Sequence, residues 1–420
     1  MGLCLRAERN DAVLRVLILD DESMVVDMLA ACLSMPGLHL TTCLETEAAE
    51  ALLRCSRFDV VVTDLSVSRL GGLDGMRLVR FVTANFPDTA VYVLSGYVDQ
   101  RVRELCAVLG VTAVLEKSEG LGRLRNLLLE RRTALAGVRE LSAEGEVQHV
   151  ERLEEFMAAN TVHAVLQPVV KLRDGGAQFE VFGVESLARG PAGSLLGSPA
   201  LFLAYAAQKE LLFDADMICI RAALEEVRHL GVPVTTFLNV QPRSLTNPDF
   251  TARLCDEVSA AAIDEKSIVL ELTEQQTIVN PAAFAATLQR LRERGFQIAL
   301  DDYGEGSSNL NLFQDLHPDF LKISGTFCRG LAHDPFKQII VQSTAEMAAR
   351  AGSATVMEAV ETAEDAEMLG RLGIDYAQGY FFLKPLPGRE LARFLRSGIS
   401  HPSGLSVLEP LGASPSGSVS

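Results

Sequence analysis

The sequence predicts an α/β protein of two domains: a small doubly wound domain, followed by a larger (β/α)8 barrel of the TIM type. The first observation is that short apolar runs alternate with amphipathic helical stretches along most of the 420 residues. The second is that the runs of the C-terminal half end in acidic or amide residues. The carboxyl ends of parallel strands in a barrel meet around one pocket, so these side chains are expected to share a site.

Composition limits the kinds of partner that the chain can bind. A hydrophobic fraction of 48% and a charged fraction of 22% are ordinary for a globular protein. The formal net charge of −17 argues against DNA, or any nucleic acid bound along its phosphate backbone. A small phosphate ligand held through metal ions remains compatible with this charge.

The chain shows no signal for export or membrane insertion. Its eight cysteines are scattered and form no CxxC pair, which favours buried thiols in a reducing compartment. No apolar stretch approaches the roughly 18 residues of a membrane span, and the N-terminus lacks a signal-peptide pattern. We therefore expect a cytoplasmic protein without membrane association.

The first domain is expected over residues 14–132 as a doubly wound, flavodoxin-like fold. Four apolar runs predict its strands, namely LRVLIL, FDVVVTD, AVYVLS and VTAVLE. Chemistry in such a fold gathers at the carboxyl ends of the strands. In this domain, those ends carry Asp20, Asp21, Asp64, Ser95 and Lys117.

These five residues form a candidate phosphorylation site. Asp20, Asp21 and Asp64 would bind one Mg²⁺ and leave Asp64 able to attack a phosphoryl donor. Ser95 and Lys117 would contact the phosphoryl oxygens through a hydroxyl and a positive charge.

With ILDD, VVTDL, VLSG and LEKS in these places, the segment resembles a response-regulator receiver domain. The resemblance implies that a cognate sensor histidine kinase phosphorylates Asp64 and that a shift of the late helices transmits the new charge. The alternative is a receiver fold that serves only for docking or dimerisation.

The rest of the chain is expected to contain a linker, the barrel and a tail. We expect the linker at 133–147, the barrel domain at 148–397 and a disordered tail, rich in Ser, Gly and Pro, at 398–420. The segment EVQHVERLEEFMAAN predicts the first helix of the second domain.

A second group of polar residues follows the apolar runs of the barrel half. Five carboxylates that share one pocket would repel one another unless cations balance them. Two divalent ions together with one lysine ammonium would bring the charge to zero, which points to a two-metal phosphodiester site. The group consists of Glu185, Asn239, Glu271, Asp301, Asp302, Lys322 and Glu358.

The motifs around these residues resemble the EAL-domain family of cyclic di-GMP phosphodiesterases over about 250 residues. This resemblance implies a metal-dependent hydrolase of TIM-barrel fold that opens cyclic di-GMP to pGpG, and it implies a homodimer. The motifs, in order along the chain, are VESLARG, FLNVQPRSL, LELTEQQ, ALDDYGEGSS, DFLKIS, MEAVET and AQGYFFLKPLP.

The same resemblance implies a role for each residue. Two Mg²⁺ or Mn²⁺ ions would share Asp301; the first would also bind Glu185, Asn239 and Glu271, and the second Asp302 and Glu358. Lys322 and Glu358 would act in catalysis, by holding and deprotonating the nucleophilic water. The substrate contacts would be Arg189, Gln167, Asp216 and Gln378, and the supports of the catalytic loop would be Glu274 and Glu361.

The chain departs from the family pattern near the second metal. The family loop DFGTGYSSL is DYGEGSSNL here, so Glu305 replaces a threonine, and Ser324 replaces the aspartate that normally stands two residues after the lysine. The leading hypothesis is a phosphodiesterase controlled by receiver phosphorylation, with activity lowered by these changes. The alternatives are a cyclic di-GMP receptor that hydrolyses too slowly to matter, and an interaction module that signals through protein contacts alone.

Overall fold

The structure is a computed structural model that describes residues 13–65, 74–96, 98–118, 120–136, 146–173, 178–273, 280–305, 309–397 and 407–408. Glu274 and most of the expected linker and tail lie outside these residues. The chain divides into two compact units: Met1–Thr161 with Gly190–Leu211, and Val162–Arg189 with Leu212–Ser420. No described helix is both long and apolar enough to cross a membrane.

A parallel sheet forms the middle of the first unit, in the order β5-β4-β3-β1-β2-β6. The run LHLTTC, which was not among the expected strands, forms β2. The strands are β1 (Leu14–Leu19), β2 (Leu38–Cys43), β3 (Val60–Thr63), β4 (Ala90–Ser95), β5 (Ala113–Glu116) and β6 (Glu146–His149).

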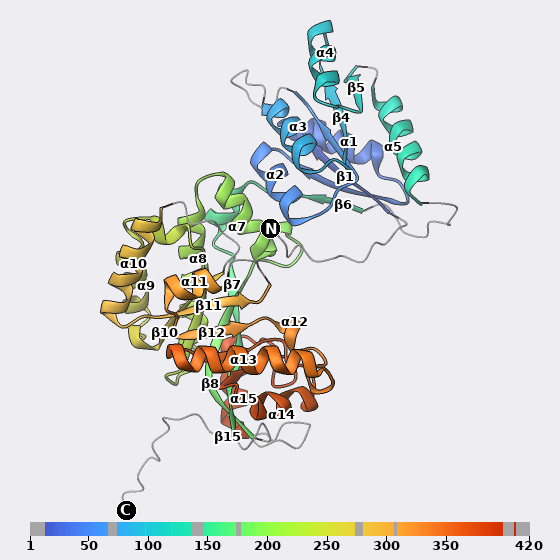
Figure 1. Cartoon of the computed structure of the whole chain (residues 1–420). Coiled ribbons are helices and arrows are strands. Elements are labelled where there is room, and N and C mark those ends of the chain that lie inside the picture. Colours follow the sequence, from blue (N-terminus) through green and yellow to red (C-terminus); the bar gives the residue numbers. More distant parts are fainter. Residues whose placement is uncertain are drawn as a thin grey trace, which may run out of the picture. The chain divides into compact units, whose positions relative to one another are not determined.

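Helices cover this sheet (Figure 1). Buried leucines of α1 and α5, among them Leu29 and Leu124, pack on Val16 and Ile18 of β1 and form the core of this unit. The confirmed doubly wound fold thereby holds the carboxyl ends of the strands in fixed positions. The helices are α1 (Ser23–Leu33), α2 (Thr46–Cys55), α3 (Asp74–Asn85), α4 (Gln100–Val108), α5 (Gly120–Ala136), α6 (Leu153–Ala159) and α7 (Pro199–Gln208).

The helix expected from Glu146 onwards is wrong in its first part. Residues Glu146–His149 form β6, which pairs in parallel with β2, and the helix begins only at Leu153. The Thr42 hydroxyl donates to the Gln148 carbonyl at 3.4 Å, and the backbone N–H of Val150 donates to the Thr42 carbonyl at 2.9 Å. An unpaired sheet edge favours the addition of such a strand, and this gain outweighs the helical pattern of the segment.

The segment Gly190–Leu211 groups with the first unit, although the sequence places it inside the expected barrel domain. Its helix α7 packs against α2. The Glu45 carboxylate, at the start of α2, accepts hydrogen bonds from the Tyr205 hydroxyl and from Lys209 Nζ, the latter at 2.9 Å. The segment thus joins the receiver fold through a largely buried polar cluster.

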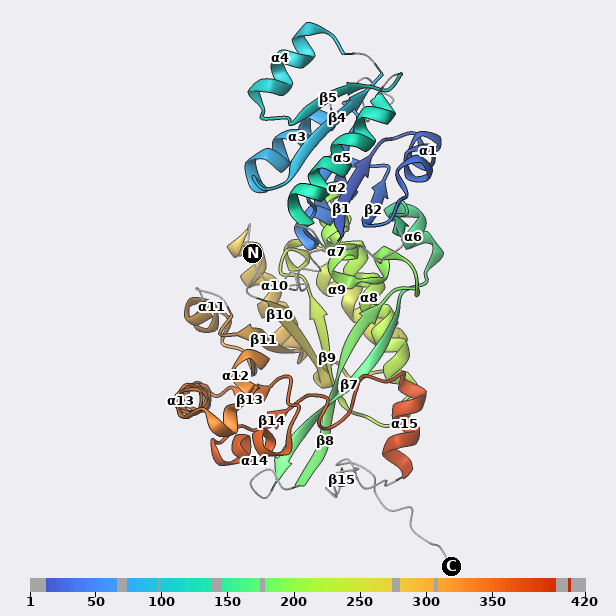
Figure 2. The same cartoon turned by 90° about the vertical axis from the view of Figure 1, so that its right-hand side faces the viewer.

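The second unit is a closed barrel of eight strands, β7 to β14, in which a pairing between β8 and β9 completes the ring. The (β/α)8 barrel is confirmed, but the parallel arrangement expected for its strands does not hold for β7, which runs antiparallel to both β8 and β14. Figure 2 shows the long β7 and β8 side by side. The strands are β7 (His163–Arg173), β8 (Gln178–Arg189), β9 (Thr235–Val240), β10 (Ile268–Thr273), β11 (Gln297–Tyr303), β12 (Phe320–Ile323), β13 (Ala354–Met357), β14 (Tyr376–Ala377) and β15 (Val407–Leu408), the last of which pairs with β8.

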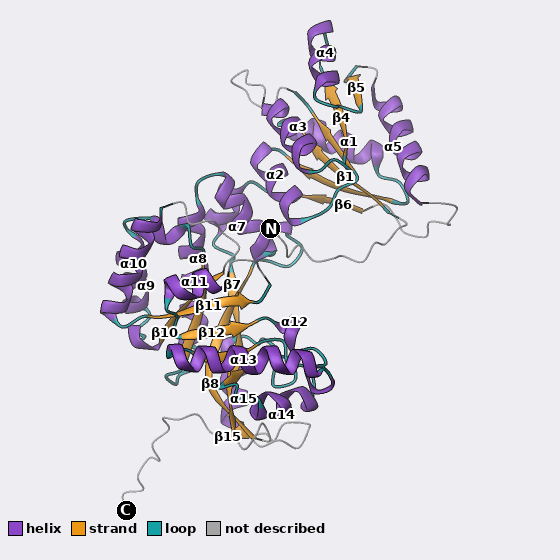
Figure 3. Cartoon of the chain, in the orientation of Figure 1, coloured by secondary structure: helices purple, strands orange, loops and turns teal. Residues whose placement is uncertain are grey.

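Helices lie outside the barrel strands (Figure 3). Inside the barrel, a separate apolar cluster receives one side chain from each of six strands and fills the space below the strand ends. The cluster consists of Val169, Phe237, Val269, Ala299, Phe320 and Val356. The helices are α8 (Leu212–Arg228), α9 (Phe250–Ala260), α10 (Pro281–Arg294), α11 (Asn309–Leu316), α12 (Gly325–Cys328), α13 (Pro335–Ala351), α14 (Ala363–Arg371) and α15 (Gly388–Ser397).

Candidate functional site

The alternation of strand side chains places the candidate residues at the mouth of the barrel. Five of the site residues follow an inward-facing core residue by two positions, as Glu271 follows Val269 and Lys322 follows Phe320. Side chains two positions apart on a strand share a face, so the site forms the next layer above the apolar plug. Asn239, Asp301 and Glu358 stand in the same relation to Phe237, Ala299 and Val356.

Lys322 lies at the centre of this layer, with only 1% of its surface exposed. Its Nζ is 2.9 Å from Glu271, 2.8 Å from Asp301 and 2.9 Å from Glu358. A fourth carboxylate, Glu185, lies at 3.4 Å. An ammonium group so deeply buried is tolerable only with such compensation, and the lysine in turn holds the carboxylates close together.

The carboxylates outnumber the lysine, and their pKa values reflect this imbalance. Burial raises the pKa of Glu271 well above its usual range, and the charge of Glu185 adds to this effect. Burial also raises the pKa of Glu358 to about 8, since the nearby Lys322 offsets only part of the cost. For Glu185 the lysine and two amide hydrogen bonds outweigh burial, so its pKa is lowered.

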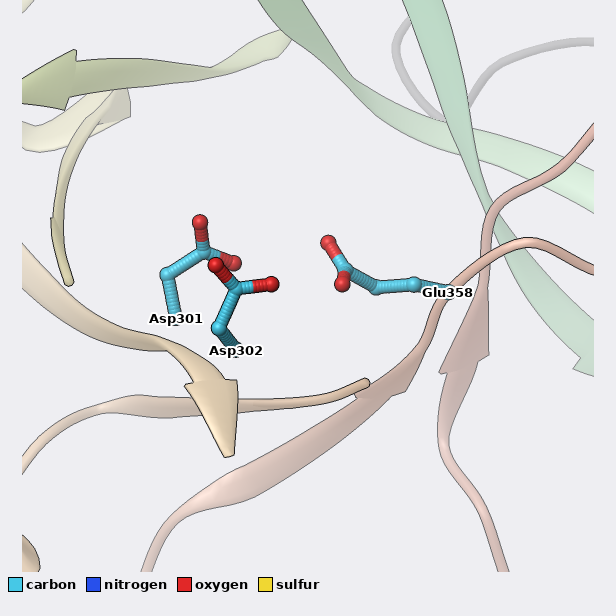
Figure 4. A group of neighbouring side chains, drawn as sticks. All are labelled: Asp301, Asp302 and Glu358. Atoms are coloured by element: carbon cyan, nitrogen blue, oxygen red, sulfur yellow. The ribbon is translucent and has the colours of Figure 1, made fainter. Parts of the chain in front are cut away.

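Asp301 and Asp302 are consecutive, yet both carboxylates face the site. The register between β11 and β12 shifts between Leu300 and Tyr303, and Asp302 adopts a left-handed φ of 56°. Such a bulge cancels the alternation of the strand for one residue. Figure 4 shows Asp301, Asp302 and Glu358 pointing toward one another, and one carboxylate oxygen from each lies within 4.8 Å of the others.

Amide side chains fix Glu185 from the other side. Gln378 Nε2 donates to Glu185 at 2.6 Å and to the side-chain oxygen of Gln167 at 3.1 Å. Asn239 Nδ2 donates to the other Glu185 oxygen at 3.1 Å. These contacts bring together Gln167, Asn239 and Gln378, as expected for one site.

The residues fit hard divalent cations. The Oε2 atom of Glu271 is buried and has no hydrogen-bond partner among the described residues. A buried anionic oxygen without a partner is costly unless a cation lies against it. The donors nearby are carboxylate and amide oxygens, which suit Mg²⁺ or Mn²⁺ and not zinc.

The other expected residues lie outside this cluster or are not described. The Asp216 carboxylate is 1% exposed and accepts a hydrogen bond from the Gln241 backbone at 3.1 Å, and burial raises its pKa to about 7. Arg189 Nη1 donates to the Ala188 carbonyl at 2.7 Å, and Glu361 is exposed on the loop after Glu358. Glu274 lies outside the described residues.

Sequence reasoning treated Glu305 only as a replaced threonine. Burial raises the pKa of Asp302 to about 6, and the charges of Asp301 and Glu305 contribute to this shift. The charge of Glu305 therefore acts on Asp302, although Glu305 is not one of the five carboxylates of the site. The altered loop sequence was the signal for it.

In the receiver unit, Lys117 contacts two aspartates of the candidate phosphorylation site. Lys117 Nζ, after β5, lies 2.6 Å from Asp20, after β1, and 2.7 Å from Asp64, after β3. Ser95 is buried at the end of β4, and Asp21 follows Asp20 in a half-buried position. Burial raises the pKa of Asp20, which the Lys117 hydrogen bond offsets only in part.

Comparisons with known proteins agree with this architecture. The model of the EAL domain family matches residues 150–385, and that of the response regulator receiver domain matches residues 16–129. The cyclic di-GMP phosphodiesterase RocR of Pseudomonas aeruginosa is 27% identical over 386 residues, which cover 89% of this chain and 96% of that protein. The probable cyclic di-GMP phosphodiesterase PdeB of Escherichia coli is 31% identical, but the chain covers only 46% of it.

Solved structures give the same fold. The chain matches the PaMucR phosphodiesterase in complex with c-di-GMP at 25% identity and a TM-score of 0.51, over 57% of this chain and 97% of that one. The EAL enzyme Bd1971, in its cAMP-bound form, matches at 24% identity and a TM-score of 0.53, over 71% and 76% of the two chains, and supports the fold alone. The chain is thus a member of the EAL domain family that carries an N-terminal response regulator receiver domain.

Proposed function

We propose that this chain is a response regulator that hydrolyses cyclic di-GMP to pGpG at the barrel site, with two divalent cations, under the control of phosphorylation at Asp64. The observation that carries the proposal is the group of carboxylates that Lys322 gathers at the barrel mouth. The relatives RocR and PaMucR, whose names describe them as phosphodiesterases, support the choice of reaction and substrate.

The donors divide into two sets that share Asp301. Glu185, Asn239 and Glu271 would hold one cation, and Asp302 and Glu358 the other. The cations, when bound, would supply Lewis acidity for the attack of water on phosphorus. Their charge would also balance the four negative charges that five carboxylates and one lysine leave.

The side chains of the protein supply orientation and proton transfer. Lys322 holds Glu271, Asp301 and Glu358 in fixed positions and would stabilise the charge that develops on the phosphate. Glu358 is the candidate base, because it reaches the edge of the cluster and is more exposed than Glu271. Gln167, Gln378, Arg189 and Asp216 would contact the substrate around this core.

Control by phosphorylation has its own structural support. Asp64 and Lys117 are in contact, and a sensor histidine kinase is the partner that would deliver the phosphoryl group. The segment that begins directly after Arg189, the last residue of β8, packs through α7 on α2 of the receiver unit. A change in this unit would therefore act on a segment covalently continuous with the strand that carries Glu185. A homodimer, implied by the family resemblance, remains part of the proposal.

The test is a chromatographic assay of cyclic di-GMP with purified full-length protein and Mn²⁺ or Mg²⁺, with and without acetyl phosphate. The variant is Glu358→Ala, and the matched control is Glu364→Ala, an exposed glutamate at the start of α14. We expect pGpG from the wild type and the control, and none from Glu358→Ala. Saturable binding of intact ligand without turnover would instead identify a receptor.

A further inference from the structure

The loop that carries Asp302 is fastened to the corner after β12 by one pair of side chains. Ser324, the residue directly after β12, is 1% exposed, and its hydroxyl donates to the Glu305 carboxylate at 2.6 Å. The same oxygen accepts from the Thr326 backbone at 3.2 Å and from the Thr326 hydroxyl at 3.1 Å. One donated and two accepted bonds satisfy the serine hydroxyl completely.

Backbone hydrogen bonds also hold the residues that follow Asp302 in place. The N–H of Glu305 donates to the Asp302 carbonyl at 3.2 Å, and the N–H of Ser324 donates to the Tyr303 carbonyl at 3.2 Å. Gly304 has a φ of 103°, and a Cβ atom there would lie 2.3 Å from the Phe327 ring. The left-handed Asp302 therefore depends on where the next three residues are held.

A carboxylate at position 305 is unfavourable for simple electrostatics, because it adds negative charge beside Asp302 and the rest of the acidic site. Its visible compensation is the charge-assisted hydrogen bond from Ser324. In the family pattern the hydroxyl stands at position 305, as threonine, and the carboxylate stands at position 324, as aspartate. This chain has exchanged the two groups between the same two positions.

We propose that Glu305 and Ser324 form a compensated pair of positioning residues, which sets the Asp302 carboxylate for the second cation. The proposal rests on the proposed function, and it adds a specific support for one ligand. Either exchange alone would break the pair. The change Glu305→Thr would leave two hydroxyls facing each other, and the change Ser324→Asp would leave two carboxylates.

The test is a double-mutant cycle of Glu305→Thr, Ser324→Asp and the combined variant in the full-length protein. Mn²⁺ binding is measured by calorimetry and electron paramagnetic resonance without substrate, and kcat and KM are measured for cyclic di-GMP. We expect Ser324→Asp to weaken the second Mn²⁺ about 10 to 100-fold and Glu305→Thr to weaken it less. In the combined variant, the affinity for the second Mn²⁺ should return to within about threefold of the wild-type value. Across the variants, kcat should change in parallel with this affinity, whereas KM should not.

A gentler pair of variants keeps the test decisive if Ser324→Asp fails to fold. Glu305→Gln retains an acceptor oxygen for Ser324 and should stay near the wild type, whereas Ser324→Ala removes the donor and should weaken the second Mn²⁺. Additive effects in the cycle, or equal Mn²⁺ binding by Ser324→Ala and the wild type, would overturn the pairing. If the pairing fails but the wild type binds two Mn²⁺ ions in the barrel and hydrolyses cyclic di-GMP, the proposed function is still supported.

Discussion

Each of the two units contains a cluster of carboxylates around one lysine, but the clusters differ in burial and in number of charges. In each, a lysine at a strand end contacts carboxylates from other strands of the same sheet. The Lys117 side chain is 24% exposed and contacts two aspartates, whereas Lys322 is 1% exposed and contacts four carboxylates. With Asp21 included, three aspartates and one lysine leave two net negative charges in the receiver site. With Asp302 included, five carboxylates and one lysine leave four in the barrel site. The difference matches one divalent cation in the first and two in the second.

The largest expected difference between the sites concerns stability. Lys322→Met leaves several buried carboxylates without their cation, so the barrel unit should lose about 3 to 5 kcal/mol of unfolding free energy in metal-free buffer. Lys117 is 24% exposed, although the two aspartates that it contacts are buried, so Lys117→Met should cost the receiver unit less, about 1 kcal/mol. Hydrogen exchange measured at increasing urea concentration gives the unfolding free energy of each unit separately, and so distinguishes the two effects. Equal losses would mean that burial does not distinguish the two lysines.

The number of bound ions provides the next comparison. Titration of the full-length protein with Mn²⁺ should give three sites, two in the barrel and one in the receiver. Asp301→Asn removes the ligand that we propose the two barrel ions share, so it should leave only the receiver ion, while Asp20→Asn should leave the barrel pair. Loss of a single ion in Asp301→Asn would show that the two barrel ions do not share that residue.

Communication between the units should have a smaller effect on rate. If phosphorylation controls the barrel, acetyl phosphate should change the rate of pGpG formation about 5 to 150-fold, the usual range of coupling between two sites. Asp64→Asn cannot accept the phosphoryl group and should show the same rate with and without the donor. A donor effect that persists in this variant would place the control elsewhere.

The smallest expected effect concerns a buried carboxylate beside the site. The pKa of Asp216 is raised to about 7 in the folded state, so unfolding releases a proton between pH 4 and 7 and stability falls as pH rises through this window. Asp216→Asn lacks this titration. The urea midpoint of the variant, relative to that of the wild type, should therefore be higher at pH 8 than at pH 5. Parallel pH profiles would show that Asp216 already ionises at low pH in the folded protein.

The sequence predicts the inward-facing residues well because strand alternation is a local rule. Runs such as SIVLE place Glu271 above Val269, and the barrel closes as expected around them. The bulge that turns Asp302 inward, the antiparallel β7 and the strand β6 depend on pairing between distant segments. No pattern within those segments specifies such partners. The Glu305 and Ser324 exchange appears in the sequence as two separate departures, and only their contact joins them.

The most direct test of the central claim uses Glu271, whose side chain is fully buried beside Lys322 and carries an oxygen without a partner among the described residues. Glu271→Gln removes one charge while conserving shape. Formation of pGpG from cyclic di-GMP under saturating Mn²⁺ is compared between the wild type and this variant, with Mn²⁺ binding at the receiver as the folding control. The account predicts turnover by the wild type and a loss of at least about 100-fold in the variant. Equal turnover by the two proteins would contradict it.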